Sequence, residues 1–112
     1  AKYNLHILSN GFHHIQIKKM QSAGILNYFD KVITNEKANA LKPDPLIFEF
    51  ALNDTGALKS NSVMVGDNYF ADIKGALNVG IPFLHLTNSD QDFEYSNKGF
   101  GISCLSQLKM YL

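Results

Sequence analysis

The sequence predicts an α/β fold built around a largely parallel sheet. Short apolar runs alternate with segments whose apolar residues recur every three to four positions, which is typical of strands separated by amphipathic helices. Gly and Pro stand at the ends of most of these segments, where the chain is expected to turn. Parallel strands need long crossover connections, so strands that alternate with helices predict βαβ units.

The apolar runs expected to form strands cover residues 5–8, 32–34, 62–65, 81–86 and 101–103. Three helices are expected between them, with inward faces made by Ile17 and Met20, by Ile47, Phe50 and Ala51, and by Ile73, Ala76 and Leu77. Gly24, Gly56 and Gly80 read as the helix stops, and Pro43 and Pro45 open the second helix. Residues 35–41 and 87–99 are expected to be loops, and residues 105–112 a closing helix.

Composition limits the possible partners of the chain. Its 112 residues suit one compact domain, and 46% hydrophobic with 18% charged residues is typical of a soluble globular protein. All ten basic residues are Lys, and ten acidic residues bring the formal net charge to +0, so we expect no nucleic-acid partner. No apolar run approaches the ~20 residues that cross a bilayer, so we expect no membrane partner. The single Cys104 favours a reducing, cytoplasmic compartment, and we expect its thiol to be buried.

Ligands of open parallel sheets bind beyond the carboxyl ends of the strands, so polar residues that follow strands are the candidates for function. Ser9, Asn10 and Gly11 follow the first strand. A hydroxyl and backbone N–H groups at the start of a helix can bind a phosphate. Alternatively, Ser9 or Asn10 only caps that helix.

Lys42 precedes the second helix, within the segment Leu41-Lys42-Pro43-Asp44-Pro45. A cation at the positive end of a helix is unfavourable unless a negative ligand compensates it, and a phosphate would do so. The alternative is an ordinary solvated Lys on the surface.

Asp67 and Asp72 lie five residues apart across the turn between the third strand and the third helix. Mg²⁺ is commonly held by one or two carboxylates together with water and substrate phosphate, so this pair predicts a Mg²⁺ site. In the alternative, Asp67 caps the helix and Asp72 only complements the dipole in its first turns.

These three segments, taken in order, resemble the motifs of the haloacid dehalogenase-like hydrolases. "LHILSNGF" is similar to the second motif, "ILNYFDKVITNEKANALKPDPLIFEFAL" to the stretch that contains the third, and "VMVGDNYFADIKGALNVGIP" to the fourth. The resemblance implies that Ser9 and Lys42 are catalytic and bind substrate phosphate together with Asn10 and Gly11. It also implies that Asp67 and Asp72 bind Mg²⁺.

The same resemblance implies a Rossmann-like three-layer fold that is incomplete in this chain. The family's first strand carries an Asp-x-Asp motif with the nucleophile and lies at the centre of the sheet, and no residue before Leu5 supplies it. We therefore expect residues 1–112 to be the C-terminal portion of a core domain, without the helical cap. Alone, the chain would be inactive, and it could pair with the missing N-terminal segment or with another chain.

The implied activity is Mg²⁺-dependent hydrolysis of a small phosphorylated metabolite, either a nucleotide monophosphate or a sugar phosphate, through an aspartyl-phosphate. Two alternatives stay open. One is haloacid dehalogenation, which needs no Mg²⁺. The other is a non-catalytic half-domain that acts by association with a partner.

Overall fold

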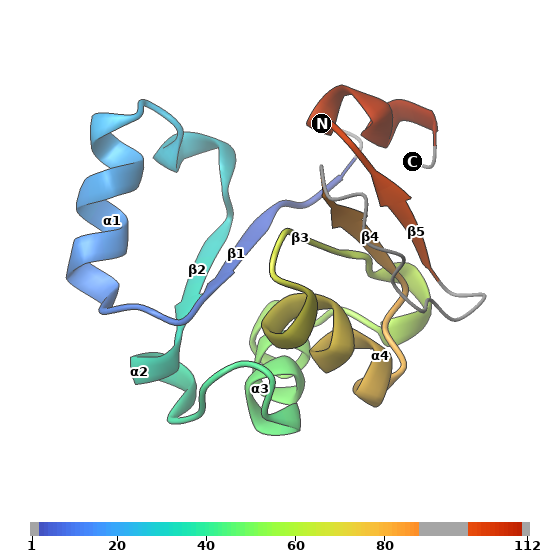
Figure 1. Ribbon diagram of the computed structural model, residues 1–112. Coiled ribbons are helices and arrows are strands. Elements are labelled where there is room, and N and C mark those ends of the chain that lie inside the picture. Colours follow the sequence, from blue (N-terminus) through green and yellow to red (C-terminus); the bar gives the residue numbers. More distant parts are fainter. Residues whose placement is uncertain (1–2, 88–98, 111–112) are drawn as a thin grey trace. The chain divides into compact units, whose positions relative to one another are not determined.

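The computed structural model describes residues 3–87 and 99–110, which belong to two compact units, Ala1–Gly56 and Ala57–Leu112. Each unit contains helices and parallel strands (Figure 1). The elements of the first unit are β1 (His6–Ser9), α1 (His13–Ser22), η1 (Leu26–Tyr28), β2 (Lys31–Thr34), α2 (Asn35–Ala38) and α3 (Pro45–Thr55). The elements of the second are η2 (Lys59–Asn61), β3 (Met64–Gly66), η3 (Tyr69–Lys74), α4 (Gly75–Val79), β4 (Phe83–Leu86), β5 (Gly99–Ile102) and η4 (Leu105–Met110).

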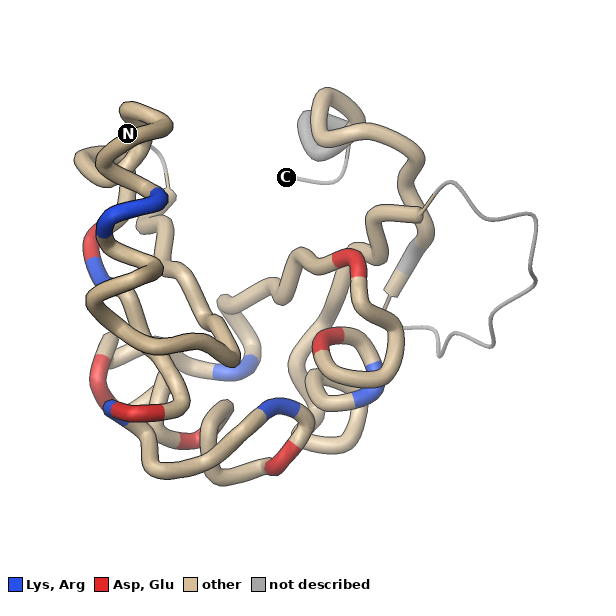
Figure 2. Tube along the Cα trace, turned by 60° about the vertical axis from the view of Figure 1, so that its left-hand side comes forward, with Lys and Arg blue, Asp and Glu red and all other residues tan. Residues whose placement is uncertain are grey.

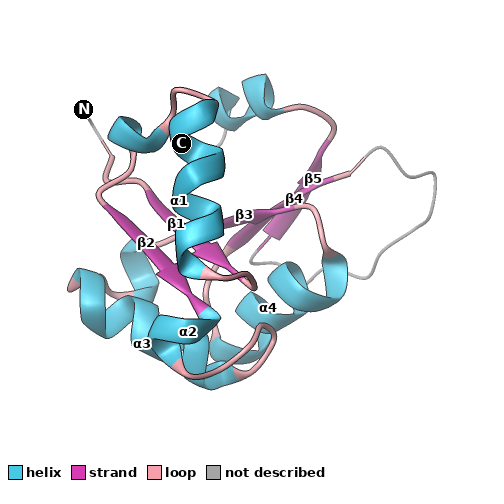
Figure 3. Ribbon diagram, turned by 90° about the vertical axis from the view of Figure 1, so that its left-hand side faces the viewer, coloured by secondary structure: helices cyan, strands magenta, loops and turns pink. Residues whose placement is uncertain are grey.

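In the first unit, β1 and β2 pair in parallel with a register that runs from His6 opposite Lys31 to Ser9 opposite Thr34. Helix α1 lies along this pair, as expected for a crossover between parallel strands (Figure 3). The buried apolar residues of the unit come from α1, β2 and α3: Met20, Val32, Ile33, Ile47 and Phe48. The strands predicted over residues 5–8 and 32–34 are thus confirmed as β1 and β2, with ends that differ by one residue.

Helix α3 begins and ends at the residues that local chemistry favours. The carboxylate of Asp44 accepts a hydrogen bond from the N–H of Leu46 at 3.0 Å, and Pro45 takes the first helical position, where no N–H is needed. Gly56 ends the helix at φ +71°, in the left-handed region. Pro43 lies before the helix rather than in it. Phe48 is the fully buried aromatic residue, whereas Phe50, which we expected to point inward, is half-buried.

The second unit is a three-stranded parallel ladder in the order β3–β4–β5. Its buried apolar residues come mainly from η3, α4 and β4, and include Ile73, Ala76, Phe83 and Leu84. Every strand pairing among the described residues of both units is parallel, which confirms the α/β prediction.

The described strands form two separate ladders, β1–β2 and β3–β4–β5. An incomplete sheet was expected from the missing central strand, and two ladders that share no strand pairing agree with that expectation. Lysines and acidic residues are interspersed along the first unit, as expected from the balanced charge (Figure 2). Within residues 3–87 and 99–110, no helix combines the length and apolar character that a membrane span requires.

Two local predictions were wrong, namely the loop over residues 35–41 and the burial of Cys104, and two of the predicted helices are not regular α-helices. Residues 35–38 form the short helix α2 inside the expected loop, with the Thr34 hydroxyl accepting from the N–H of Lys37 at 3.5 Å. The expected third helix begins as the π-helical turn η3 and becomes α-helical only at Gly75. The closing segment is 3₁₀-helical, and Cys104 is exposed because it follows the end of β5 on the way to η4. Residues 88–98 of the predicted loop, and residues 111–112 at the end, lie outside the described residues.

Candidate functional site

The candidate residues of the first unit lie where β1 ends and before α3, and Asn10 links the two segments. The Asn10 carboxamide donates from Nδ2 to the carbonyl oxygen of Lys42 at 3.0 Å and accepts from the Lys42 N–H through Oδ1 at 2.7 Å. Two hydrogen bonds to one residue fix both its peptide groups. A segment 32 residues away is thereby tied to the turn that carries Ser9.

Helix α1 has its N-cap at Phe12, with no side-chain cap hydrogen bond. The alternative in which Ser9 or Asn10 caps this helix is therefore wrong. Instead, the first helical N–H, that of His13, donates to the Glu36 carboxylate from α2. Ser9 is half-buried at the last position of β1, opposite Thr34 of β2. Its hydroxyl thus stays a candidate for binding a ligand.

Lys42 is half-buried and precedes α3 by three residues, and its peptide bond to Pro43 is cis. The backbone of Lys42 is anchored by Asn10, in contrast to that of a lysine on a free surface loop. This anchoring favours a site residue over the solvated alternative, because a fixed backbone limits where the ammonium group can reach.

The candidate residues of the second unit lie on the turn that joins β3 to η3. Asn68, not Asp67, is the N-cap of η3, and its side-chain oxygen accepts from the N–H of Ala71 at 2.9 Å. Because Asn68 holds the N-cap position, the alternative in which Asp67 caps the helix is wrong, although Asp72 does lie in the first turn of η3, as that alternative also expected. The Asp67 side chain is exposed. Asp72 is 5% exposed, and its Oδ2 accepts from the N–H of Asn68 at 3.2 Å.

A π-helical turn shapes this segment. The carbonyl oxygen of Asn68 accepts from the N–H groups of both Asp72, at 2.9 Å, and Ile73, at 3.4 Å. Such turns are rare and occur frequently at functional sites. Here the turn carries Asp72 back toward the end of β3.

Gly66 makes room for the Asp72 carboxylate. A Cβ placed on Gly66 would lie 2.4 Å from Oδ2 of Asp72, 2.5 Å from its Cβ and 2.7 Å from its Cγ. The absence of a side chain at the last position of β3 therefore lets a buried carboxylate lie against the strand end. A glycine is needed here for space.

The sequence reasoning missed His85. This residue of β4 is 1% exposed, lies opposite Gly66 in the parallel register, and places its ring Nε2 3.2 Å from the carbonyl oxygen of Asp67. A His in a predicted buried strand next to the acidic turn is the sequence signal that could have drawn attention to it.

The carboxylates of Asp67 and Asp72 suit Mg²⁺ better than a metal ion that takes all its ligands from protein side chains. Among the described residues there is no group of three or more His, Cys, Asp or Glu side chains placed to hold a metal ion. Mg²⁺ usually keeps several waters and binds through one or two carboxylates and substrate phosphates. A buried carboxylate accommodated by a glycine, with a second carboxylate five residues earlier, matches that requirement.

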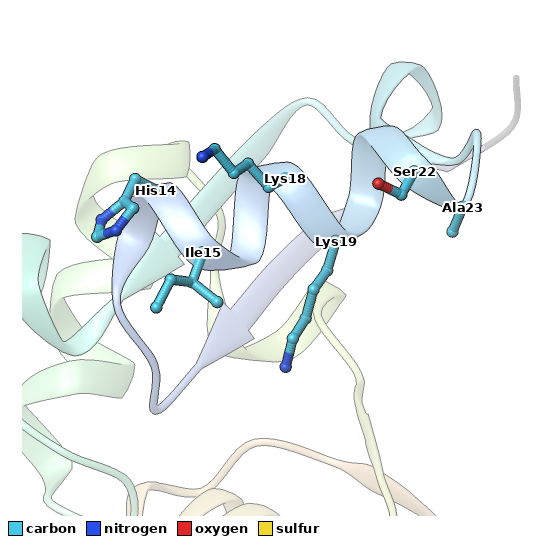
Figure 4. A pocket seen from close by; sticks show the side chains of 6 residues that line it. All are labelled: His14, Ile15, Lys18, Lys19, Ser22 and Ala23. Atoms are coloured by element: carbon cyan, nitrogen blue, oxygen red, sulfur yellow. The ribbon is translucent and has the colours of Figure 1, made fainter.

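The first unit also has a surface hollow. It is lined by side chains of α1 and the residue after it: His14, Ile15, Lys18, Lys19, Ser22 and Ala23 (Figure 4). It contains no carboxylate and none of the predicted site residues, so it is not part of the candidate site.

Comparison with known proteins agrees with these motifs. The profile of the family described as "Haloacid dehalogenase-like hydrolase" matches residues 1–86. The chain is 36% identical to a glyceraldehyde 3-phosphate phosphatase of Methanothermobacter thermautotrophicus, over 98% of this chain and 51% of that protein. It is also 36% identical to the pyrimidine 5′-nucleotidase YjjG of Escherichia coli, over 67% of this chain and 34% of that protein.

Among solved structures, the chain is similar to a haloacid dehalogenase-like phosphatase from Thermococcus onnurineus, with a TM-score of 0.88 and 34% identity over 97% of this chain and 50% of that one. The chain thus spans about half the length, or less, of the curated relatives it matches.

Proposed function

We propose, from the premise that this chain belongs to the haloacid dehalogenase-like hydrolase family, that it supplies the phosphate- and metal-binding half of a Mg²⁺-dependent phosphohydrolase. Asp72, buried against Gly66 with Asp67 on the same turn, is the observation that carries this proposal. Relatives with phosphatase activity in their names support it.

The metal would be held by Asp67 and Asp72. When bound, Mg²⁺ supplies positive charge that offsets the repulsion between an attacking carboxylate and a phosphate. The Asn68 N–H donates to Oδ2 of Asp72 at 3.2 Å and so helps to hold the carboxylate in place for this role.

Ser9 and Lys42 would act on the transferred phosphoryl group. The Ser9 hydroxyl would donate to a phosphoryl oxygen and orient the group, and the Lys42 ammonium would stabilise the charge that develops on it. The backbone bonds from Asn10 would keep Lys42 in range of that group. We place the nucleophilic Asp of the aspartyl-phosphate, and the cap, outside these 112 residues, which makes the chain the C-terminal portion of the core domain.

The substrate we propose is a small phosphorylated metabolite, a sugar phosphate or a nucleotide monophosphate. The two relatives named above act on molecules of these two kinds, as their names state. We also propose a cytoplasmic location, because one cysteine suits a reducing compartment.

Dehalogenation is the rival chemistry within the family. A dehalogenase has no need of Mg²⁺, so it would not require a carboxylate pair on the turn after β3. Asp72 is buried in a space that exists because Gly66 has no side chain. A carboxylate accommodated in this way favours a phosphatase over a dehalogenase.

The test is made in the full-length protein that carries this chain. Asp67→Asn and Asp72→Asn should each abolish Mg²⁺-dependent phosphate release and weaken Mg²⁺ binding, measured by calorimetry with MgCl₂. Asp54→Asn is the matched control, because Asp54 is a surface acid paired with Lys31 at 3.4 Å and should leave both properties unchanged. Undiminished Mg²⁺ binding in both site variants would remove the metal from this turn.

A further inference from the structure

His85 is one of three buried polar or charged residues among those described, together with Thr34 and Asp72. It lies on β4, directly opposite Gly66 in the β3–β4 register. Its imidazole is 1% exposed, so its polar atoms need partners inside the protein. The motifs that assign Ser9, Lys42, Asp67 and Asp72 do not include it.

The imidazole contacts both sides of the acidic turn. On one side, Nε2 lies 3.2 Å from the carbonyl oxygen of Asp67. A carbonyl only accepts hydrogen bonds, so this contact requires that Nε2 carry the proton. On the other side, the Tyr69 ring lies against the imidazole with centroids 5.7 Å apart and planes tilted by 58°.

From these contacts we infer that His85 is a positioning residue for the metal site, holding the Asp67–Tyr69 turn so that the Asp67 carboxylate is presented to the ion. This inference rests on the proposed function. The Asp67 side chain is exposed and its turn is short, so its direction depends on what fixes the backbone. A buried donor on a neighbouring strand fixes it more firmly than a surface contact.

The competing explanation is that His85 only fills space in the core. The two explanations differ in what the replaced side chain must provide. A positioning role requires a donor at the place of Nε2, which Gln can supply and Met cannot. A filling role requires only volume, for which Met and Gln are equally suited.

The experiment compares His85→Gln with His85→Met in the full-length protein. Calorimetric titration with MgCl₂ measures affinity, and hydrolysis of p-nitrophenyl phosphate gives kcat and the Mg²⁺ concentration for half-maximal rate. Leu84→Ala is the stability control, because Leu84 is buried on the opposite face of β4 and the change loosens the same strand.

We expect His85→Met to weaken Mg²⁺ binding by about 10- to 100-fold, the usual effect of losing a hydrogen bond behind a metal ligand. His85→Gln and Leu84→Ala should stay within about threefold of wild type, well inside that effect. If His85→Met does not fold, His85→Asn replaces it, since its amide is one methylene too short to reach Asp67.

Equal Mg²⁺ affinity in His85→Met and His85→Gln would overturn the inference, as would a loss in Leu84→Ala as large as that in His85→Met. Either result, obtained while Asp67→Asn still weakens Mg²⁺ binding, leaves the metal site in place without His85. Wild-type Mg²⁺ affinity in both Asp67→Asn and Asp72→Asn would instead refute the proposed function itself.

Discussion

Replacing Gly66 by Ala should damage the site more than any glycine substitution at an open position. The added Cβ would lie 2.4 Å from Oδ2 and 2.5 Å from Cβ of Asp72, and real side chains do not approach so closely. Turning the carboxylate to another rotamer would move Oδ2 but not the Asp72 Cβ, because rotation about χ1 leaves that atom in place. The η3 turn must therefore move away from the end of β3.

The expected loss of stability combines two effects. Overpacking a well-packed position costs about 1–3 kcal/mol. Moving the turn also weakens the hydrogen bond from the Asn68 N–H to Asp72, which contributes about 1 kcal/mol more. We expect Gly66→Ala to lower the free energy of unfolding by about 2–4 kcal/mol.

Urea unfolding of the full-length protein measures this loss, and titration with MgCl₂ measures the metal site. Gly24→Ala is the control, because Gly24 has φ +72° and nothing within 4 Å of an added Cβ. It should cost about 1–2 kcal/mol through backbone strain alone and leave Mg²⁺ binding unchanged. The reasoning is refuted if Gly66→Ala is no less stable than Gly24→Ala and binds Mg²⁺ as tightly as wild type.

Three further predictions concern other parts of the chain. Asn10→Ala removes both hydrogen bonds to the Lys42 backbone. We expect kcat for phosphate release to fall by about 10- to 100-fold while Mg²⁺ affinity stays the same. An unchanged kcat would show that Lys42 does not need these hydrogen bonds. Ile47→Ala empties a fully buried position of α3 and should cost about 2–5 kcal/mol in urea unfolding, against less than about 0.5 kcal/mol for Asp54→Asn on the same helix's surface. The Ser106 hydroxyl lies 2.9 Å from Sγ of Cys104 and lowers the pKa of that exposed thiol. Ser106→Ala should therefore raise the pKa of Cys104, reduce its thiolate fraction at pH 8 and slow its alkylation by iodoacetamide. Faster alkylation in Ser106→Ala would contradict the assigned cause.

Much of the fold could be predicted because local signals and tertiary structure agree. Pro45 and Gly56 mark the two ends of α3, and the apolar runs before Ser9 and before Asp67 lie in parallel strands. Ser9, Asp67 and Asp72 could be selected as candidate site residues because ligands of parallel sheets bind just beyond the ends of the strands.

The remaining features depend on contacts between segments distant in sequence. Helix α2 has only four residues, too short for a periodic pattern, and its Glu36 bonds the start of α1. The π-helical turn depends on Asp72 fitting against Gly66, which no helical period reveals. His85 acquires its contact with Asp67 only through the pairing of β4 with β3. Asn10 likewise acquires its role through hydrogen bonds to Lys42, which lies 32 residues away in the sequence.

The decisive measurement is phosphate release by the purified full-length protein. The protein is incubated with sugar phosphates and nucleotide monophosphates in the presence of MgCl₂ or of EDTA, and in parallel with 2-chloropropionate while chloride is measured. We expect phosphate release that requires Mg²⁺ and disappears in Asp67→Asn, with no chloride release. Chloride release that persists in EDTA, with no phosphate released from any substrate, would contradict it.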